Sequence, residues 1–251
     1  MTPFSDLLRH WRKLRRLSQL DLALDAQVSA RHISFLETGR ARPSPGMIAR
    51  LGEVLSLPLE ARNELLVSTG FAPRYSARPL SDEAMQPVIQ AVRHMLDRHA
   101  PYPGLALDRL WTVQMMNQPA HRLFAPFGLD SGGSLLDLIC APGMSDVVEN
   151  WPEVAHHSAT RLRAESRAAG GLDLLDEAAR HLMKQADTHF TTPDGPVIPV
   201  IYKLGPTRLS LFGTIAQFST VSDTTLDDLK IELFFPADAD SDALLRSLAA
   251  E

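Results

Sequence analysis

The chain has only one cysteine, Cys140, so it cannot form an internal disulfide, and such sparse use of cysteine is typical of a reducing compartment. No apolar run approaches the roughly 20 residues needed to cross a bilayer. Residues 1–16 are amphipathic and lack the apolar stretch of a secretory signal peptide. These absences argue against a disulfide-rich secreted domain and a membrane span, and they predict a cytoplasmic protein without a membrane partner.

Signatures of catalysis and of metal binding are also missing. The sequence contains no H-E-x-x-H, no Walker loop, no G-x-S-x-G and no paired cysteines at a zinc-binding spacing. His156 and His157 are adjacent, so on a helix they point roughly 100° apart and make a poor metal pair. We therefore predict that the chain is not an enzyme, and we assign it no metal site and no certain cofactor.

The net charge of −5 is unevenly distributed. Residues 1–75 contain 11 Lys and Arg against 7 Asp and Glu, whereas residues 76–251 contain 14 against 23. Such a distribution is expected if the basic first third contacts the phosphates of a nucleic acid and the acidic remainder does not. Ordinary scatter of charged residues is an equally good explanation of these counts.

Helical periodicity dominates the first 70 residues. Ser18 and Ser29 are good N-caps for two short helices, and Gly39 and Gly70 are good helix ends. The periodicity predicts three more helices, which start near residues 3, 44 and 58. Together the five helices predict an all-α domain over residues 1–70. The proline- and glycine-containing stretch 71–80 is expected to be a linker.

A second domain is expected over 81–251, and its sequence predicts both helices and strands. An amphipathic helix is predicted at 81–98, and two longer helical patterns follow near 144–168 and 172–187. Val-, Ile-, Phe- and Thr-rich segments predict two short strands near 105–115 and three more at 197–204, 208–220 and 229–235. The pattern favours an α+β domain with an antiparallel sheet.

The segment from Ser18 to Arg42 has the spacing of a DNA-binding helix-turn-helix. Small or branched residues at 22, 23 and 26 can pack the first helix on the second, and Val28 can fill the corner between them. The second helix buries Ile33 and Leu36, which leaves its other side for base edges in the major groove. Arg31 has the geometry to read guanine, and the helix ends and the following loop can contact phosphate. The predicted DNA-binding residues are Gln19, Ser29, Ala30, Arg31, Ser34, Phe35, Arg40 and Arg42.

These residues resemble the phage-repressor-like (Cro-type, XRE) helix-turn-helix family. The shared pattern, S-Q-x-x-L-A-x-x-A-x-V-S-x-x-x-I-S-x-L-E-x-G-R, covers residues 18–40. The family usually has glycine at the turn position held here by Gln27, so we expect some backbone strain there. The resemblance also implies that Glu37 pairs with Arg12 as structural scaffold.

Other interpretations remain open for this segment. A short all-α unit can be a protein-interaction domain, and Phe35 can pack inside the protein as easily as it can contact DNA. Leu20 and Leu24 form an apolar pair, one helical turn apart, at positions that normally face water. We hypothesise that this pair docks on the second domain or on a second copy of the chain.

Beyond the motif, the sequence is similar to MmyB-like regulators, which join this helix-turn-helix to a PAS-like ligand-binding domain. The resembling segments are RHISFLETGR at 31–40, RNELL at 62–66, GFAP at 70–73, SLFGTIA at 210–216 and IELFFP at 231–236, together with His99, 101–103, 107–109 and Trp111. The resemblance implies a transcription regulator with a small apolar ligand, a fatty acid being the most concrete candidate. We expect a homodimer that binds double-stranded DNA, with dimer contacts supplied by the domain at 81–251.

A PAS-like domain holds its ligand between the sheet and the helices. Alternation along the predicted strands and aromatic positions in the helical section select these candidates: Trp111, Val113, Met115, Met116, Phe124, Trp151, Phe212, Thr214 and Leu233. Residues of these types are more often plain core than ligand contacts. The alternative function is therefore a DNA-binding protein whose second domain is a dimerisation or partner-binding module without a small ligand.

Overall fold

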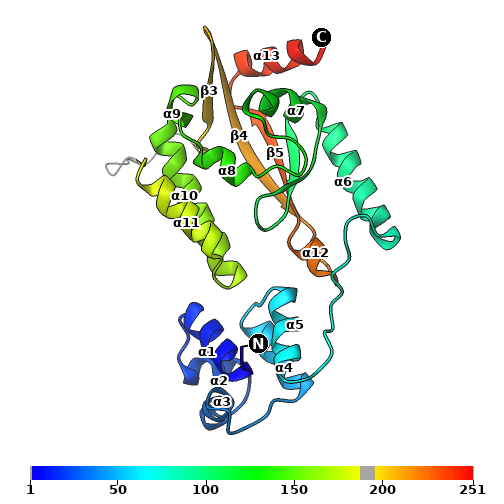
Figure 1. Cartoon of the computed structure of the whole chain (residues 1–251), viewed down its shortest axis with the longest axis vertical. Helices are drawn as coiled ribbons and strands as arrows, with labels where there is room; N and C mark the ends of the chain where they lie inside the picture. Colours follow the sequence, from blue (N-terminus) through cyan, green and yellow to red (C-terminus); the bar gives the residue numbers. More distant parts are fainter. Residues whose placement is uncertain (1, 187–195, 251) are drawn as a thin grey trace. The chain divides into compact units, whose positions relative to one another are not determined.

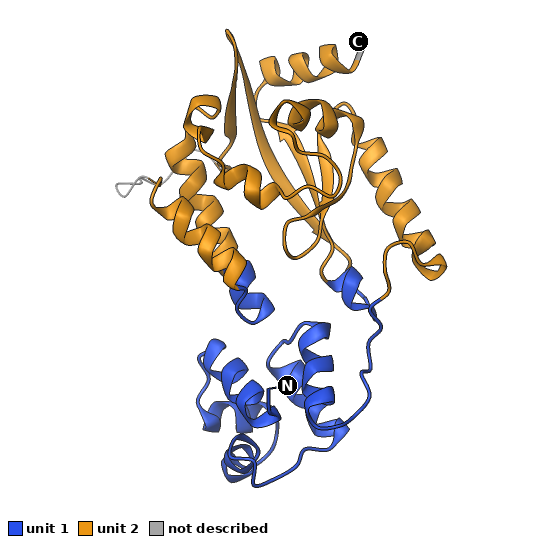
Figure 2. Cartoon of the chain, viewed as in Figure 1, with its two compact units in different colours: residues 1–77, 164–172, 220–227 blue, residues 78–163, 173–219, 228–251 orange. Residues whose placement is uncertain are grey.

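The computed structural model describes residues 2–186 and 196–250 and contains an all-α part followed by an α+β part (Figure 1). Contacts between residues divide the chain into two compact units (Figure 2). Unit 1 comprises residues 1–77, 164–172 and 220–227, and unit 2 comprises 78–163, 173–219 and 228–251. The division at residue 77 lies inside the stretch expected to be a linker.

Unit 1 contains the five predicted helices. Serine side chains cap three of them, because Ser18, Ser29 and Ser44 each accept a hydrogen bond from a backbone N–H in the first turn. Ser18 and Asp21 form a full capping box. The helices are α1 (Phe4–Leu14), α2 (Gln19–Asp25), α3 (Ala30–Glu37), α4 (Pro45–Val54) and α5 (Leu59–Ser68).

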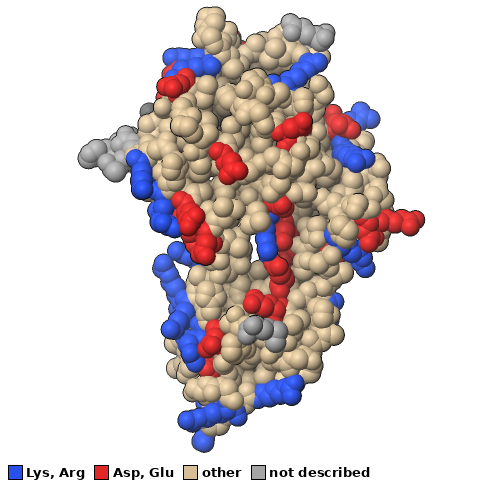
Figure 3. Space-filling view, in the orientation of Figure 1, with Lys and Arg blue, Asp and Glu red and all other residues tan. Residues whose placement is uncertain are grey.

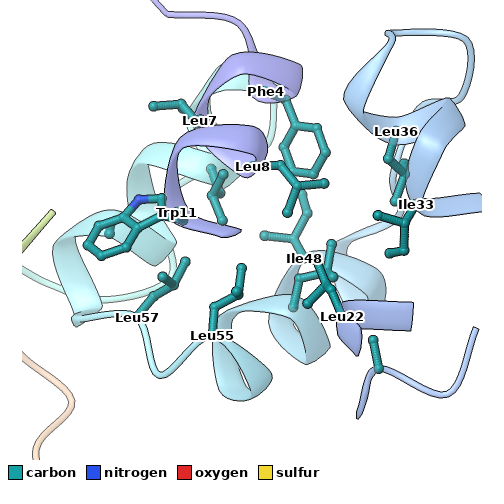
Figure 4. Close-up of a cluster of buried hydrophobic side chains, with 14 of the residues drawn as sticks. Phe4, Leu7, Leu8, Trp11, Leu22, Ile33, Leu36, Ile48, Leu55 and Leu57 are labelled. Carbon is teal, nitrogen blue, oxygen red and sulfur yellow. The ribbon is translucent and has the colours of Figure 1, made fainter. Parts of the chain in front are cut away.

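One apolar core holds these helices together (Figure 4). Phe4, Leu8 and Trp11 come from α1 at three- and four-residue spacings, so they share one face of that helix. Leu22 of α2 and Ile33 of α3 are fully buried in the same core. The periodicity of the sequence therefore identified the inward faces of these helices correctly.

Unit 2 is built on a five-stranded antiparallel sheet with strand order β2-β1-β5-β4-β3, which confirms the predicted α+β class. The strands are β1 (Gly104–Leu107), β2 (Val113–Met116), β3 (Val200–Leu204), β4 (Thr207–Gln217) and β5 (Lys230–Pro236). The helices are η1 (Glu83–Met85), α6 (Gln86–Arg98), α7 (Gln118–Phe124), η2 (Ala125–Phe127), α8 (Leu135–Cys140), α9 (Met144–Val147), α10 (Trp151–Ala169), α11 (Asp173–Met183), α12 (Thr224–Asp227) and α13 (Ala239–Ala250), of which α12 and the end of α10 belong to unit 1.

The register assigns the strand residues to two faces of the sheet. Leu105 pairs with Glu232 and Gly104 pairs with Leu233, so these two pairs lie on opposite faces. The face of Gly104 and Leu233 is packed against α6, since a Cβ on Gly104 would lie 3.1 Å from both Leu233 and Leu96. The face of Glu232 is covered by α8 and α10, whose residues line a cavity with it.

The single helix predicted at 144–168 is wrong. Val148 leaves the helical conformation and forms a bridge with Tyr202, and Asn150 bonds to the backbone of residues 199 and 201. These long-range bonds to β3 separate α9 from α10, and periodicity alone does not reveal them. Within the described ranges, no helix has both the length and the apolar character of a membrane span.

Candidate functional site

The turn between α2 and α3 sets the direction of α3. Gln27 has φ 54°, in the left-handed region, as expected for the position where the motif normally has glycine. The Val28 N–H donates to the Ala23 carbonyl at 2.9 Å and closes the turn. The Ser29 hydroxyl then accepts from the His32 N–H at 3.1 Å and starts α3. Local sequence chemistry therefore specifies this turn.

The outer side of α3 carries the predicted base-reading residues. Ile33 and Leu36 are fully buried, whereas Arg31 is exposed and Ser34 and Phe35 are half-buried. The Arg31 guanidinium lies 5.2 Å from the Phe35 ring centre. The structure thus presents one arginine and one aromatic ring together on the surface of α3.

A buried carboxylate joins α3 to the two preceding helices. Glu37 is 1% exposed, and it accepts hydrogen bonds from Arg12 Nε at 2.6 Å and Nη2 at 2.9 Å, and from Gln19 Nε2 at 2.7 Å. Burial acts to raise the pKa of Glu37, but the bonds from Arg12 and Gln19 outweigh it and leave the pKa below its ordinary value. The pairing of Arg12 with Glu37 that the resemblance implied is confirmed.

The loop after α3 is basic, and Figure 3 shows Lys and Arg side chains gathered on unit 1 around the region that Figure 1 labels α3. The Arg40 guanidinium lies 6.0 Å from the Phe35 ring centre. Arg42 is turned elsewhere, since its Nη2 donates to the Thr69 carbonyl at 2.6 Å at the end of α5. Arg40 therefore extends the basic surface of α3, while Arg42 ties the loop to α5.

Unit 2 contains a cavity of about 130 Å³ between the sheet and helices α8 and α10. Its walls are mainly apolar, and the polar residues among them are Ser158, Arg161, Tyr202 and Glu232. The indole N–H of Trp151 donates to Gln185 at 2.8 Å. The apolar walls are Phe124, Phe127, Leu135, Leu138, Ile139, Met144, Val148, Val154, Val200 and Phe234 with the rings of Trp111 and Trp151. A mainly apolar lining with few polar groups is usual for a small-molecule site, and the volume is smaller than the roughly 300 Å³ at which most such sites begin.

An ion pair forms the polar end of this cavity. Arg161 of α10 donates to the carboxylate of Glu232, which is 5% exposed. The same guanidinium lies 4.5 Å from the centre of the Trp111 ring, and Lys230 Nζ lies 5.1 Å from that ring. Burial, together with the charge of Glu232, raises the pKa of Tyr202 to about 12, so its hydroxyl is neutral at physiological pH.

Trp111 is held in an unusual backbone conformation at this end of the cavity. Its φ of 66° is left-handed, which is rare for a large side chain. The Asp108 carboxylate accepts from the N–H groups of Leu110 and Thr112 and shapes the turn, and Leu135 N–H donates to the Trp111 carbonyl at 3.0 Å. The turn thus places a 3% exposed indole against Arg161.

A second, larger cavity of about 320 Å³ lies in unit 2 near α7 and α13. Its walls are almost entirely apolar, and Arg122 and Gln118 contribute the polar side chains. The Arg122 guanidinium donates to the Leu248 carbonyl and so joins α7 to α13. Phe127 lines both cavities.

Comparison with known families identifies both domains. Residues 3–65 match a helix-turn-helix domain, and residues 88–248, well over half of the chain, match the MmyB-like transcription regulator ligand binding domain. The chain belongs to the MmyB-like transcription regulators. The helix-turn-helix domain and the regulator domain together make this MmyB-like protein a DNA-binding transcription regulator with a ligand-binding domain, and these are not domains of an enzyme family.

A curated relative supports the assignment of the first domain of this MmyB-like regulator. The chain is 39% identical over 61 residues to the uncharacterized HTH-type transcriptional regulator RghRB of Bacillus subtilis (strain 168). The match covers 24% of this chain and 44% of the relative, so the chain spans less than half of that protein. The likeness therefore concerns only part of each protein.

Three of the nine predicted ligand residues of this regulator line the smaller cavity, namely Trp111, Phe124 and Trp151. Val113 and Met116 lie outside the lining of both cavities. Four others lie on the sheet face opposite the cavity, because the register aligns them with the Gly104 side: Met115, Phe212, Thr214 and Leu233. They therefore do not line this cavity, and alternation could not have shown it, because it separates two faces without saying which one α8 and α10 cover.

Sequence reasoning missed Glu232 and Tyr202, which provide polar groups of the cavity. Glu232 lies in the IELFFP segment, where a carboxylate in an apolar strand is an unusual signal. Tyr202 lies on β3, which β4 separates from the strand of Glu232, and its sequence has no local signal beyond its position in a β-like run.

Proposed function

We propose that this regulator recognises its operator through the outer side of α3 and responds to a small apolar molecule bound in the 130 Å³ cavity. The observation that supports base reading is the exposed Arg31 on a helix whose other side is anchored by Ile33 and Leu36. Arginine is the side chain best suited to bidentate contact with guanine in the major groove. Ser34 and Phe35 share that side and Ser29 caps the helix, whereas Ala30 is half-buried and packs against the unit 1 core.

Phosphate contacts are proposed for the flanking groups. Arg40 lies exposed after α3. Gln19 uses one amide N–H on Glu37 and has a second N–H to donate, beside the N-terminus of α2. Arg42 retains further guanidinium N–H groups beside its bond to Thr69. These contacts position α3 without specifying sequence.

Selection of DNA from a random library tests the assignment. The wild-type chain should enrich a motif at moderate salt, and Arg31→Ala should lose that motif. Arg31→Lys keeps the charge but not the bidentate fork, so it should retain salt-dependent binding while losing most of the base preference. If the wild type enriches no motif, or if Arg31→Ala enriches the same one, α3 is not the reading element.

The ligand proposal depends on the mainly apolar lining of the cavity. Mass spectrometry of an organic extract of the purified chain should detect a bound molecule in stoichiometric amount. Ser158→Phe, which places a ring in the cavity, should abolish it. Thr160→Phe is the matched control, because Thr160 is exposed on the same helix. An apolar chain such as that of a fatty acid suits the walls, and its head group has to meet the Arg161–Glu232 pair.

Homodimer formation is part of the proposal, and Leu20 and Leu24 support it. Their side chains on α2 are 58% and 66% exposed, so they form an apolar pair on the surface. Leu24→Glu should weaken a dimer, as measured by sedimentation at several concentrations, and the exposed Asp25→Asn serves as control. An unchanged dimer in Leu24→Glu removes this surface from consideration. A dimer together with an empty extract favours the alternative, a second domain that mediates assembly without a ligand.

A further inference from the structure

We infer that a cleft of about 220 Å³ in unit 1 binds a small aromatic carboxylate. The cleft is lined by α4, α5 and the segment 71–75 that follows α5, and Figure 1 labels both helices. Among the described residues, none of those lining it belongs to α3 or to unit 2. It is therefore a site apart from the base-reading surface and from the two cavities of unit 2. Arg62 and Arg74 are assigned the role of binding the carboxylate.

The chain segment that follows α5 is a fixed wall of this cleft. At its start, the Phe71 N–H donates to the Leu66 carbonyl at 3.0 Å, so the chain turns back on α5. At its end, the Asn63 Oδ1 accepts from the N–H groups of Arg74 at 2.8 Å and Tyr75 at 3.0 Å. The Asn63 Nδ2 donates to the Tyr75 carbonyl at 2.8 Å. The cleft is therefore a built part of unit 1.

The walls of the cleft are mostly apolar, since six of the nine lining residues have apolar side chains. Ile48 of α4 and Leu66 of α5 are 1% and 8% exposed and form its most buried part. The rings of Phe71 and Tyr75 are half-buried at its side. Aromatic rings pack favourably on another planar ring in offset or edge-to-face geometry. A ligand with an aromatic body uses these walls, whereas a hydrated phosphate group does not.

The charge of the lining is positive. Within the described part of the chain, Arg62 and Arg74 line the cleft and no Asp or Glu does. Neither arginine side chain forms an ion pair with a described residue. Arg42 adds to the positive charge, since its guanidinium lies 5.8 Å from the centre of the Phe71 ring. A ligand anion that enters the cleft therefore meets positive charge that no described carboxylate neutralises.

Arg62 is oriented by the protein itself. A Cβ on Gly52 would lie 3.1 Å from Arg62 Cγ and 3.3 Å from Cδ, so the stem of this arginine packs directly on the backbone of α4. Arg62 Nε donates to the Leu57 carbonyl at 2.8 Å, which leaves the N–H groups of Nη1 and Nη2 for a ligand. A side chain held at both places loses less conformational freedom on binding. Its bonds to a carboxylate are charge-assisted, and such bonds are roughly twice as strong as those between neutral groups.

The volume limits the size of the ligand. A cavity of about 150 Å³ takes a molecule of the size of benzene. The 220 Å³ of the cleft therefore takes one ring with a carboxylate, such as benzoate. It is smaller than the roughly 300 Å³ at which sites for larger ligands begin.

The test compares probes that separate the charge from the ring. Benzoate, benzamide, acetate and inorganic phosphate are titrated into the ¹⁵N-labelled full chain at neutral pH, and backbone amide shifts report both affinity and place. We expect benzoate to bind at least about tenfold more tightly than the others, because benzamide lacks the charge, and acetate and phosphate lack the apolar ring. Its shift changes should centre on residues 71–75 and the adjoining turns of α4 and α5.

Two variants locate the cause. Arg62→Gln should weaken benzoate binding about tenfold and leave benzamide binding unchanged, because it removes the oriented guanidinium. Arg74→Gln should weaken it only about threefold, since Arg74 is exposed and its charge is screened by solvent. Arg50→Gln is the matched control, because Arg50 is exposed on α4 but does not line the cleft. It should leave the benzoate affinity unchanged.

Each contrary outcome overturns the inference for a stated reason. Equal affinities of benzoate and benzamide, or an unchanged affinity in Arg62→Gln, would remove the role of the arginines. If acetate or phosphate binds as tightly as benzoate, the cleft attracts anions of any kind, as a contact with DNA phosphate would. Shift changes confined to unit 2, or no binding at millimolar benzoate, would show that the cleft is not the site. These results do not bear on the ligand proposed for unit 2, which the organic extract tests. The wild-type comparison and its shift map hold even if a variant folds poorly.

Discussion

Replacing Glu37 by glutamine is expected to loosen unit 1 without altering its shape. Glutamine has the same length and keeps one acceptor, but it leaves Arg12 facing a neutral group in a site where the carboxylate is 1% exposed. Removing one partner of a buried ion pair costs about 3–5 kcal/mol. Since the Arg12 side chain is 12% exposed and glutamine preserves part of the hydrogen bonding, we expect about 2 kcal/mol.

Amide hydrogen exchange in α1 and α3 measures this effect in the full chain. A loss of about 2 kcal/mol accelerates exchange through local opening by roughly thirtyfold. Glu53→Gln is the control, because Glu53 is exposed on α4, and such changes alter stability by less than about 0.5 kcal/mol. If Glu37→Gln exchanges at the rate of the control, the bonds from Arg12 and Gln19 contribute nothing to holding α3.

The same carboxylate makes part of the stability dependent on pH. The folded pKa of Glu37 is lower than its unfolded value of about 4.3, so its stabilisation is complete above that value and is lost as the pH falls through the folded pKa. The difference in thermal midpoint between wild type and Glu37→Gln should therefore be constant near neutrality and shrink in acid. A difference that persists unchanged at the lowest pH contradicts this reasoning.

Two further predictions concern backbone strain and tyrosine ionisation. Gln27→Gly should raise the free energy of unfolding in urea by about 0.5–1 kcal/mol, because φ 54° strains a residue that has a Cβ. Gly39→Ala should lower it by about 1 kcal/mol, because Gly39 has φ 71°, although the added methyl meets open space. Equal effects of the two changes would contradict the assignment of both to backbone strain. The pKa of Tyr202 near 12 predicts that Tyr202→Phe leaves the ultraviolet titration unchanged between pH 9 and about 11. A lost titrating step in that range would show that the hydroxyl is not buried beside Glu232.

The helix-turn-helix could be predicted almost entirely from the sequence. Ser18, Ser29 and Val28 act within a few residues of their own position, so spacing alone specifies the helix starts and the turn. Even the strained turn at Gln27 was expected from the departure at that one position. The hydrogen bonds of Gln19 and Arg42 could not be predicted in this way, because their partners Glu37 and Thr69 belong to other helices or their ends.

The cavity could be predicted only in outline. Strand content, strand order in the chain and three aromatic wall residues followed from composition and alternation. The break between α9 and α10 did not, because Val148 and Asn150 respond to β3, which lies about fifty residues later in the chain. Interactions of this kind depend on the path of the whole chain and leave no periodic signal.

Read alone, the sequence determined a serine-capped helix pair that exposes Arg31 within an all-α domain, followed by an α+β domain. Capping, turn chemistry and periodicity act over short distances, so they can be recognised in the sequence. Only the tertiary structure decided which face of the sheet lines the cavity. It also decided that Arg161 meets Glu232, a partner 71 residues away. Strand alternation is symmetric between the two faces, and that symmetry is broken only when α6 packs on one face and α8 and α10 pack on the other.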